Sequence, residues 1–204
     1  MTARTIDKSG TLNDESEPRR AIAIASSMGG IKALCKVVSS LPGDLPAAIL
    51  VVQHLSPLYE SQLPSILSRR TTLRVKAAED NLKLYAGTIY VAPPNYHLIV
   101  NPGGTISLSN APKQHFVRPS AEYTFKSLAS SYREKAIAIV LTGCDGDGKE
   151  GVQAVKKMGG KVIAQDRSTS QVFSMPENAI ETGCVDLVLP LDEIADGIAN
   201  MVLH

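Results

Sequence analysis

Tryptophan is absent from this chain of 204 residues, and the other aromatic side chains are few, with three Phe and six Tyr. A hydrophobic core of this composition must therefore be mainly aliphatic. Cysteine is also scarce: Cys35, Cys144 and Cys184 are odd in number and lack the paired spacing of zinc sites. This cysteine usage favours free thiols in the reducing cytoplasm, and we expect no bound metal.

The chain has almost no charge excess, because 21 Lys and Arg residues oppose 20 Asp and Glu residues, which leaves a net charge of +1. Nucleic-acid-binding domains normally carry a strong basic excess, so we expect no nucleic-acid partner. No apolar run approaches the roughly 18 to 20 residues that span a bilayer. The N-terminus also lacks the apolar segment of a secretory signal. We therefore expect a cytoplasmic protein that does not insert into a membrane.

Hydrophobic residues make up 44% of the chain, which is typical of a globular domain, and the length suits one domain. Residues 1–19 are polar and charged and predict a flexible N-terminal tail, too short to be a domain. Residues 20–204 alternate apolar runs of strand length with segments of helical periodicity. Strands are predicted at 21–25, 47–52, 136–141, 161–164 and 185–189. Helices are predicted at 31–41, 60–70 (interrupted by Pro64), 120–132, 150–158 and 191–202.

The middle of the chain has a different pattern. Short runs at 88–92, 96–100 and 105–108 are separated by turns rich in proline, glycine and asparagine, which indicates antiparallel hairpins. Elsewhere, apolar strands that alternate with helices predict a parallel sheet covered on both faces. The predicted fold is α/β: a doubly wound, mostly parallel sheet with helices on both faces and an antiparallel hairpin insertion.

Polar clusters follow the three most apolar strands. They are Ser-Ser-Met-Gly-Gly at 26–30, Gln53-His54, and Thr-Gly-Cys-Asp-Gly-Asp-Gly at 142–148. Because ligands bind at the carboxyl ends of parallel strands, we expect these clusters to lie along one edge of the sheet. A serine on a glycine-rich turn, a histidine and an aspartate are the components of a Ser-His-Asp hydrolase, and backbone N–H groups at the start of the following helix would stabilise an oxyanion.

Other sites fit these clusters less well. A dinucleotide-binding turn needs G-x-G-x-x-G and an acidic residue after the second strand, and a P-loop needs G-K-[ST]; neither pattern is present. A calcium loop that began at Asp145 would need glycine and glutamate where Glu150 and Lys156 stand. A lone histidine or an Asp-Gly turn is more often structural. The hydrolase is therefore a hypothesis that depends on the convergence of all three clusters.

Several short motifs also occur in a characteristic order. They are Ile24-Ala-Ser-Ser-Met-Gly-Gly30, Gln53-His54-Leu-Ser-Pro57, Tyr90-Val-Ala-Pro-Pro94, Arg118-Pro-Ser120, Leu141-Thr-Gly143 with Asp147-Gly148, Ala164-Gln-Asp166 and Met175-Pro176. Taken together, over residues 21–198, they resemble the catalytic domain of the bacterial chemotaxis protein-glutamate methylesterases, the CheB family.

This resemblance implies a serine hydrolase that demethylates γ-glutamyl methyl esters on chemoreceptor cytoplasmic helices and releases methanol, with glutamine deamidation in some members. It implies that Ser27 is the nucleophile, His54 the general base and Asp147 the carboxylate that orients the base. The backbone N–H groups of Met28 and Cys144 match the oxyanion hole. No cofactor is implied.

The chain departs from the family pattern at several positions. Ser26 stands where the family has alanine, Met28 replaces threonine and Cys144 replaces methionine. Ala25 replaces a glycine, a change that is harmless only where φ is negative. Asp145 and Gly146 replace a Gly-Asn type pair, so a second carboxylate lies near Asp147 and could favour the charged form of the histidine or compete for its N–H.

The resemblance also raises the question of control. Family members usually carry an N-terminal receiver domain, and we expect residues 20–204 to form a CheB-type catalytic domain without one. The expected partners are methylated chemoreceptor helices or another methylated signalling protein, with a methyltransferase or a receiver protein acting in trans. The alternatives are a catalytically weak CheB-like module that regulates by binding a receptor or methyltransferase, and a hydrolase of small carboxylic esters.

Overall fold

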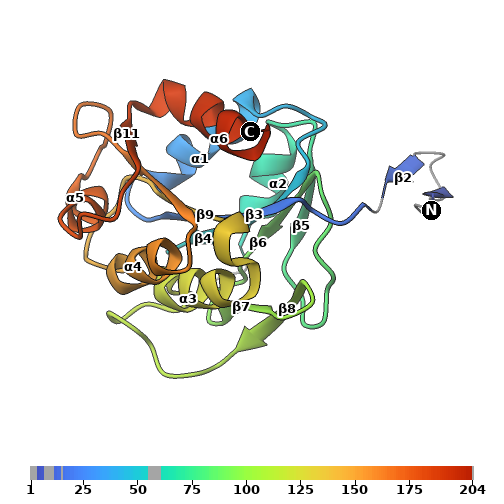
Figure 1. Cartoon of the computed structure of the whole chain (residues 1–204), viewed down its shortest axis with the longest axis horizontal. Coiled ribbons are helices and arrows are strands. Elements are labelled where there is room, and N and C mark those ends of the chain that lie inside the picture. Colours follow the sequence, from blue (N-terminus) through green and yellow to red (C-terminus); the bar gives the residue numbers. More distant parts are fainter. Residues whose placement is uncertain (1–3, 7–11, 15, 55–60, 204) are drawn as a thin grey trace.

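A seven-stranded parallel sheet forms the centre of the molecule (Figure 1). The computed structural model describes residues 4–6, 12–14, 16–54 and 61–203. Every pair of neighbouring strands in this sheet is parallel. The strands, in their order across the sheet, are β11 (Leu187–Leu189), β10 (Lys161–Gln165), β9 (Ala136–Val140), β3 (Arg20–Ser26), β4 (Ala47–Gln53), β6 (Thr88–Val91) and β5 (Arg74–Ala77).

Helices cover both faces of the sheet (Figure 1). One face carries α1 (Gly30–Ser40), α2 (Leu63–Ser68), the short 3-10 turn η2 (Leu191–Glu193) and α6 (Ile194–Leu203). The other face carries α3 (Ala121–Tyr132), which ends in the 3-10 turn η1 (Arg133–Lys135), α4 (Lys149–Lys157) and α5 (Ser174–Ile180). The predicted α/β class and its helices on both faces are therefore confirmed.

The two faces of the central strands differ in side-chain size. Along β3, Ile22 and Ile24 point into the core under α1, whereas Ala21, Ala23 and Ala25 point toward α3 and α4. This alternation follows from the period of two in a strand. Because the alanine side chains are small, the backbone of α3 can lie close to β3. The helices supply large side chains to this part of the core. The core is aliphatic, as the composition predicts, with Phe125 and Tyr90 as the largest buried side chains.

The hairpin prediction is partly wrong. Residues 97–101 and 105–109 do form an antiparallel hairpin of β7 (His97–Asn101) and β8 (Thr105–Ser109), which packs on α3. However, β6 is not part of a hairpin: it pairs in parallel with β4 and β5, and all its residues are buried. Its Thr-Ile-Tyr-Val sequence suits a strand that is covered on both faces.

Within residues 20–204, the strand β5 (Arg74–Ala77) and the helix α5 were not predicted, and one helix differs from its prediction. The edge strand β5 has the sequence Arg-Val-Lys-Ala, which lacks the apolar character of an inner strand. The short helix α5 contains Pro176. Pro64 does not interrupt α2 because it lies in the first turn, where its missing N–H would have no partner in any case.

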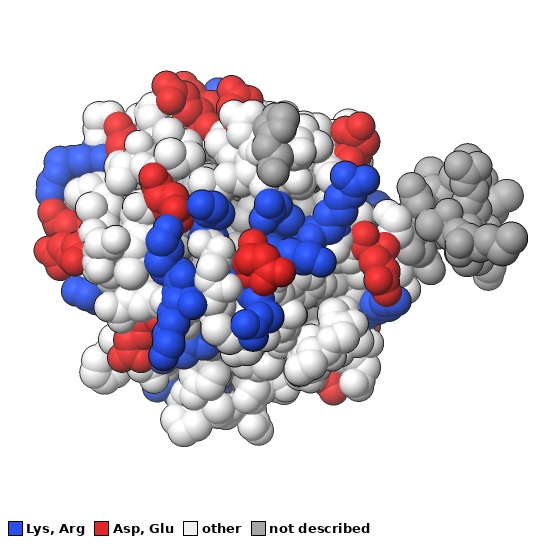
Figure 2. Space-filling model, viewed as in Figure 1, with Lys and Arg blue, Asp and Glu red and all other residues white. Residues whose placement is uncertain are grey.

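Outside the sheet, the structure describes two short antiparallel strands within the range of the predicted tail, β1 (Arg4–Ile6) and β2 (Leu12–Asp14). The other residues before Ser16 lie outside the described residues, and the flexible tail stays a prediction. Figure 2 shows basic and acidic side chains interspersed on the face in view, in line with the net charge of +1. Cys35, Cys144 and Cys184 are free cysteines. None of the helices in the described residues has the length and apolar character of a membrane span.

The contact between α3 and α4 depends on a glycine. A Cβ atom on Gly151 of α4 would lie 2.6 Å from the Cβ of Phe125 on α3, a side chain that is fully buried. We expect Gly151→Ala to lower the free energy of unfolding by about 1–3 kcal/mol, because the forced separation of the helices outweighs the gain in helix propensity. Urea denaturation measures this change.

The matched control is Gln153→Ala, an exposed position on the same helix. We expect this control to change the free energy of unfolding by less than about 0.5 kcal/mol. A Gly151→Ala variant as stable as the wild type would contradict the proposed close contact of α3 and α4.

Candidate active site

The three polar clusters meet at the carboxyl ends of β3, β4 and β9. The backbone N–H of His54, after β4, donates to the carbonyl oxygen of Ser26 (3.1 Å), and the N–H of Ser27 donates to the carbonyl oxygen of Thr142, after β9 (3.0 Å). These bonds hold the three strand ends side by side. Residues 55–57 of the Gln-His-Leu-Ser-Pro motif lie outside the described residues.

The adjacent serines have different environments. Ser26 is fully buried and its hydroxyl donates to the side-chain oxygen of Gln53 (2.7 Å). The amide nitrogen of Gln53 donates in turn to the carbonyl oxygens of Ser27 (2.9 Å) and His54 (3.0 Å), so it ties the two turns together. Ser27 is half-buried, and its hydroxyl has no hydrogen-bond partner in the described part of the chain. Of the two, only Ser27 has a hydroxyl that is uncommitted.

Close backbone approach around Ser27 requires glycine at two positions. A Cβ on Gly30 would lie 2.7 Å from the Ser26 hydroxyl, and a Cβ on Gly143 would lie 2.8 Å from the Cβ of Ser27. The loop after β9 therefore packs directly against the serine turn. Ala25 lies inside β3 and is not among the residues with positive φ, so alanine in place of the family's glycine is accommodated there.

His54 is held by Asp147. The imidazole Nε2 lies 2.7 Å from Oδ2 of Asp147, and both side chains are buried, at 8% and 0% exposure. An ionised carboxylate only accepts hydrogen bonds, so the neutral imidazole carries its proton on Nε2. The other nitrogen, Nδ1, is buried and has no hydrogen-bond partner among the described residues. Nδ1 is therefore the nitrogen with a lone pair free to accept a proton.

Asp147 is held in turn by the N-terminus of α3. Its Oδ1 accepts hydrogen bonds from the Ser120 hydroxyl (2.6 Å) and the Glu122 N–H (3.3 Å), and its Oδ2 accepts one from the Ala121 N–H (2.6 Å). Burial by itself would raise the pKa of the Asp147 carboxyl, but the hydrogen bonds from the imidazole, Ser120 and Ala121 outweigh it and lower that pKa below its ordinary value. Asp147 is therefore ionised at neutral pH.

A second carboxylate makes the reciprocal contact. Glu122 of α3 is buried, and its two oxygens accept the backbone N–H groups of Glu150 (2.9 Å) and Gly151 (2.6 Å) in the first turn of α4. Burial raises the pKa of Glu122 above its ordinary value in spite of these bonds. The N-terminus of α3 thus binds a carboxylate from the loop before α4, and the N-terminus of α4 binds a carboxylate from α3.

Neither Ser120 nor Glu122 is assigned a role in the site by the sequence alone. Ser120 carries a recognisable signal, because a serine directly before a helix is a preferred N-cap, and its hydroxyl accepts the Glu122 N–H (3.2 Å). Glu122 carries no comparable signal, since nothing in its own helix indicates that its carboxylate reaches α4.

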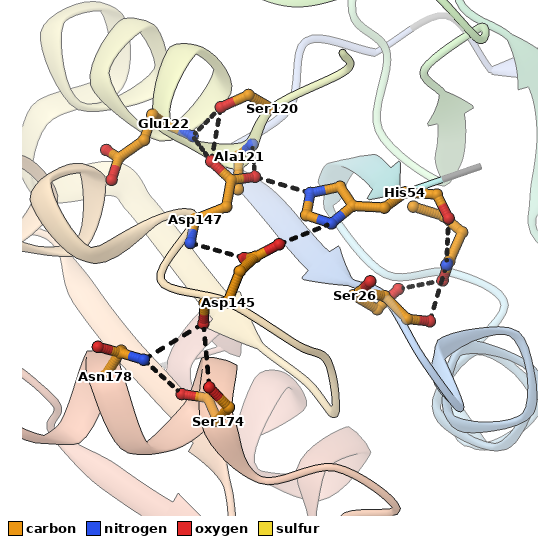
Figure 3. Close-up of polar contacts among 11 residues, drawn as sticks. Ser26, His54, Ser120, Ala121, Glu122, Asp145, Asp147, Ser174 and Asn178 are labelled. Carbon is orange, nitrogen blue, oxygen red and sulfur yellow. Dashed lines mark hydrogen bonds and ion pairs between the residues drawn. The ribbon is translucent and has the colours of Figure 1, made fainter. Parts of the chain in front are cut away.

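The remaining predicted positions surround the same point. The backbone N–H groups of Met28 and Cys144 have no acceptor within the described residues, which leaves both available to a ligand. Asp145 faces the other ring nitrogen of His54, with its Oδ2 3.9 Å from Nδ1 (Figure 3). No hydrogen bond joins the Ser27 hydroxyl to His54 in the described part of the structure.

Comparison with known proteins assigns this arrangement to a family. The family model described as CheB methylesterase matches residues 22–198. A Methanosarcina acetivorans protein named protein-glutamate methylesterase/protein-glutamine glutaminase 2 is 43% identical over 192 residues, which are 91% of this chain and 54% of that protein. A Leptospira interrogans protein named putative protein-glutamate methylesterase/protein-glutamine glutaminase is 36% identical over 176 residues, 86% of this chain and 91% of that protein.

A solved structure also matches. The crystal structure of the Thermotoga maritima CheB methylesterase catalytic domain has a TM-score of 0.86 and 38% identity, and the match covers 90% of this chain and 98% of that one. The chain spans about half the length of the Methanosarcina protein and of several other curated relatives.

The hydrogen bonds of Asp147 lead to a prediction about stability. Ser120→Ala removes a donor to the carboxylate and the N-cap of α3, so we expect the free energy of unfolding at pH 7 to fall by about 1–2 kcal/mol. The fold lowers the pKa of Asp147, so the ionised group stabilises the fold above its unfolded pKa of about 3.9. This contribution is lost as the pH falls through the lower folded value, and the deficit of the variant should therefore shrink below about pH 4.

Urea denaturation of wild type and variant at pH 7 and pH 3 measures both effects. Ser130→Ala is the control, because Ser130 is exposed on the same helix and donates only to the carbonyl oxygen of Lys126. A Ser120→Ala deficit that does not depend on pH would mean that the lost hydrogen bond does not act through the ionised carboxylate.

Proposed function

The chain belongs to the CheB methylesterase family, and on that premise we propose that it is a serine hydrolase that demethylates glutamate methyl esters on a signalling protein and releases methanol. The observation that carries this proposal is the state of His54. Its Nε2 is hydrogen-bonded to the buried Asp147 carboxylate at 2.7 Å, and its Nδ1 has no hydrogen-bond partner among the described residues. We assign residues 20–204 to the catalytic domain.

In the proposed reaction, the Ser27 oxygen attacks the ester carbonyl carbon while His54 Nδ1 takes the hydroxyl proton. The Asp147 carboxylate stabilises the imidazolium that forms. The carbonyl oxygen becomes an oxyanion, which accepts hydrogen bonds from the N–H groups of Met28 and Cys144. Neither of these two N–H groups has an acceptor within the described residues.

The tetrahedral intermediate then collapses. The bond from carbon to the methoxy oxygen breaks, that oxygen takes the proton from His54 Nδ1, and methanol leaves the acyl-enzyme. Water then attacks the acyl carbon while Nδ1 accepts one of its protons, and the proton returns to the Ser27 oxygen as the glutamate carboxyl is released. The sum is one ester and one water converted to one acid and one methanol.

The absence of a hydrogen bond from the Ser27 hydroxyl to His54 among the described residues is compatible with these steps. Hydrogen bonds in active sites without substrate are often long or unmade and tighten in the complex. Ser27 is fixed through its backbone by Thr142, Gln53 and Gly30, so only rotation about its Cα–Cβ bond is needed to bring the hydroxyl to a new partner. The proposal requires that this rotation take the hydroxyl to Nδ1.

The same acyl chemistry extends to an amide, with ammonia in place of methanol as the leaving group. We include glutamine deamidation in the proposal because the names of the relatives contain both activities. The proposed substrates are the methylated cytoplasmic helices of a chemoreceptor, or another methylated signalling protein. Met28, 53% exposed beside Ser27, gives such a helix an apolar contact next to the nucleophile. We place the reaction in the cytoplasm, where the three free cysteines stay reduced.

A serine-directed fluorophosphonate tests the nucleophile. We expect it to label the wild type covalently and to leave Ser27→Ala unlabelled. Ser26→Ala is the matched control and should be labelled like the wild type, because the Ser26 hydroxyl is buried against Gln53. Labelling that survives in Ser27→Ala would refute the assignment. A wild type that is not labelled would favour the non-catalytic alternative, a module that binds a receptor or methyltransferase.

Methanol release from a methylated receptor tests Asp147. Asparagine in its place can donate a hydrogen bond to Nε2, which would put the imidazole proton on Nδ1 and abolish the base. We expect Asp147→Asn to reduce kcat by about 10⁴-fold. Asp192→Asn, an exposed carboxylate paired with Lys36, removes one charge far from the site and should stay within about twofold. Equal turnover in Asp147→Asn and wild type would remove Asp147 from the mechanism.

A further inference from the structure

Asp145 holds an unusual backbone conformation next to the candidate active site. Its φ is +81°, in the left-handed region that most residues with a side chain avoid. Aspartate tolerates this region better than most, because its short side chain can bond to the local backbone. Glycine, which the family pattern has at this position, would adopt the conformation without strain. A carboxylate here therefore has a conformational cost that a glycine would not have.

Three contacts fix Asp145 in place, one through its carboxylate and two through its backbone carbonyl. Its Oδ1 accepts the backbone N–H of Asp147 (2.9 Å), which closes a local turn. Its own carbonyl oxygen accepts the side-chain amide of Asn178 (3.3 Å) and the hydroxyl of Ser174 (3.5 Å), both on α5. With one oxygen held by the loop, the other oxygen points at the imidazole of His54 (Figure 3).

The distance from Asp145 Oδ2 to His54 Nδ1 is 3.9 Å, too long for a hydrogen bond and within the range of an ion pair. The two side chains are 33% and 8% exposed, so solvent screens their interaction less than it would at the surface. The imidazole thus lies between two carboxylates: Asp147 contacts Nε2, and Asp145 faces Nδ1, the buried nitrogen without a partner.

Other charged and titratable groups face this pair from neighbouring elements. His115, in the segment between β8 and α3, interacts favourably with the ionised form of Asp145, whereas Asp147 on the same loop disfavours it. Burial raises the pKa of the Asp145 carboxyl above its ordinary value, and the Asp147 N–H and His54 oppose this rise. Glu122 of α3 and His97 of β7 interact with Asp147.

We propose that Asp145 is a positioning residue for the hydrolysis: its carboxylate stabilises the His54 imidazolium that forms when Nδ1 takes the proton of Ser27. This inference rests on the proposed function, since it concerns the same proton transfer. Asp147 stabilises the imidazolium from the Nε2 side in any case. Asp145 adds a second negative charge on the side where the proton arrives, at a position where the family pattern has glycine and therefore no charge.

The consequence is a trade between rate and pH range. A carboxylate near Nδ1 favours the charged imidazole both in the resting enzyme and in the transition state. Proton transfer from Ser27 is therefore faster once the base is free. Removing the charge should shift the acid limb of the pH–rate profile to lower pH and lower the plateau.

Two variants separate charge from conformation. Asp145→Asn keeps an oxygen that can accept the Asp147 N–H and tolerates the positive φ, but it removes the charge. Asp145→Gly removes the whole side chain and adopts the positive φ freely. Glu150→Gln is the matched control, because it removes the same charge from an exposed side chain that pairs with Lys126 and does not contact His54.

The readout is the rate at which a fluorophosphonate modifies Ser27, measured against pH. This rate reports the activation of Ser27 by His54 and needs no protein substrate. We expect the acid limb to move to lower pH in both Asp145 variants, with a plateau lower by about threefold to tenfold. We expect Glu150→Gln to match the wild type. A purely structural role for Asp145 would change stability and leave the midpoint unmoved.

Equal midpoints in wild type and Asp145→Asn would overturn the inference while the proposed function stands. A wild type that is not labelled at any pH would instead contradict the proposed function. In that case the inference is still tested by an NMR titration of the His54 ring in Ser27→Ala, with and without Asp145→Asn. The two titration curves should differ if the Asp145 charge acts on the ring, and identical curves would overturn the inference.

Discussion

The exchange of two buried carboxylates between the N-termini of α3 and α4 organises this molecule. A helix N-terminus has backbone N–H groups without partners in its own helix, and it favours negative charge. Here Asp147, in the loop that leads into α4, binds the first turn of α3, and Glu122 of α3 binds the first turn of α4. Each helix supplies what the other lacks, so the two helices and the loop between β9 and α4 are fixed as one unit.

The candidate chemistry follows from that exchange. Because α3 takes up Asp147 from one side, the remaining approach to Oδ2 is open to His54, which donates from Nε2 at 2.7 Å. The orientation of the ring then leaves Nδ1 facing Asp145 and without a hydrogen-bond partner among the described residues. The backbone bonds from Ser27 to Thr142 and from His54 to Ser26 keep the strand ends in register with this pair. The N-terminus of α3 thus fixes Asp147, and Asp147 determines which nitrogen of His54 carries the proton.

Much of this architecture could be predicted from local sequence. The apolar runs of β3, β4 and β9 predict buried parallel strands. The polar clusters that follow these strands in the sequence predict a site at one edge of the sheet. The pairing of β6 could not be predicted in this way, because a short buried run has the same pattern in a hairpin and in a parallel sheet. The role of Glu122 is also non-local, since its carboxylate bonds to residues 28 and 29 positions further along the chain. Asp145 could be recognised as an extra carboxylate, but its contacts with the Asp147 N–H and with His54 depend on the folded loop.

The proposed mechanism depends most directly on which nitrogen of His54 carries the proton in the neutral ring. A long-range ¹H–¹⁵N correlation spectrum of the histidine rings identifies the protonated nitrogen without any substrate. The proposed mechanism requires the proton on Nε2, toward Asp147, and an unprotonated Nδ1. A neutral ring protonated on Nδ1 would leave no free base beside Ser27 and would contradict the proposed mechanism.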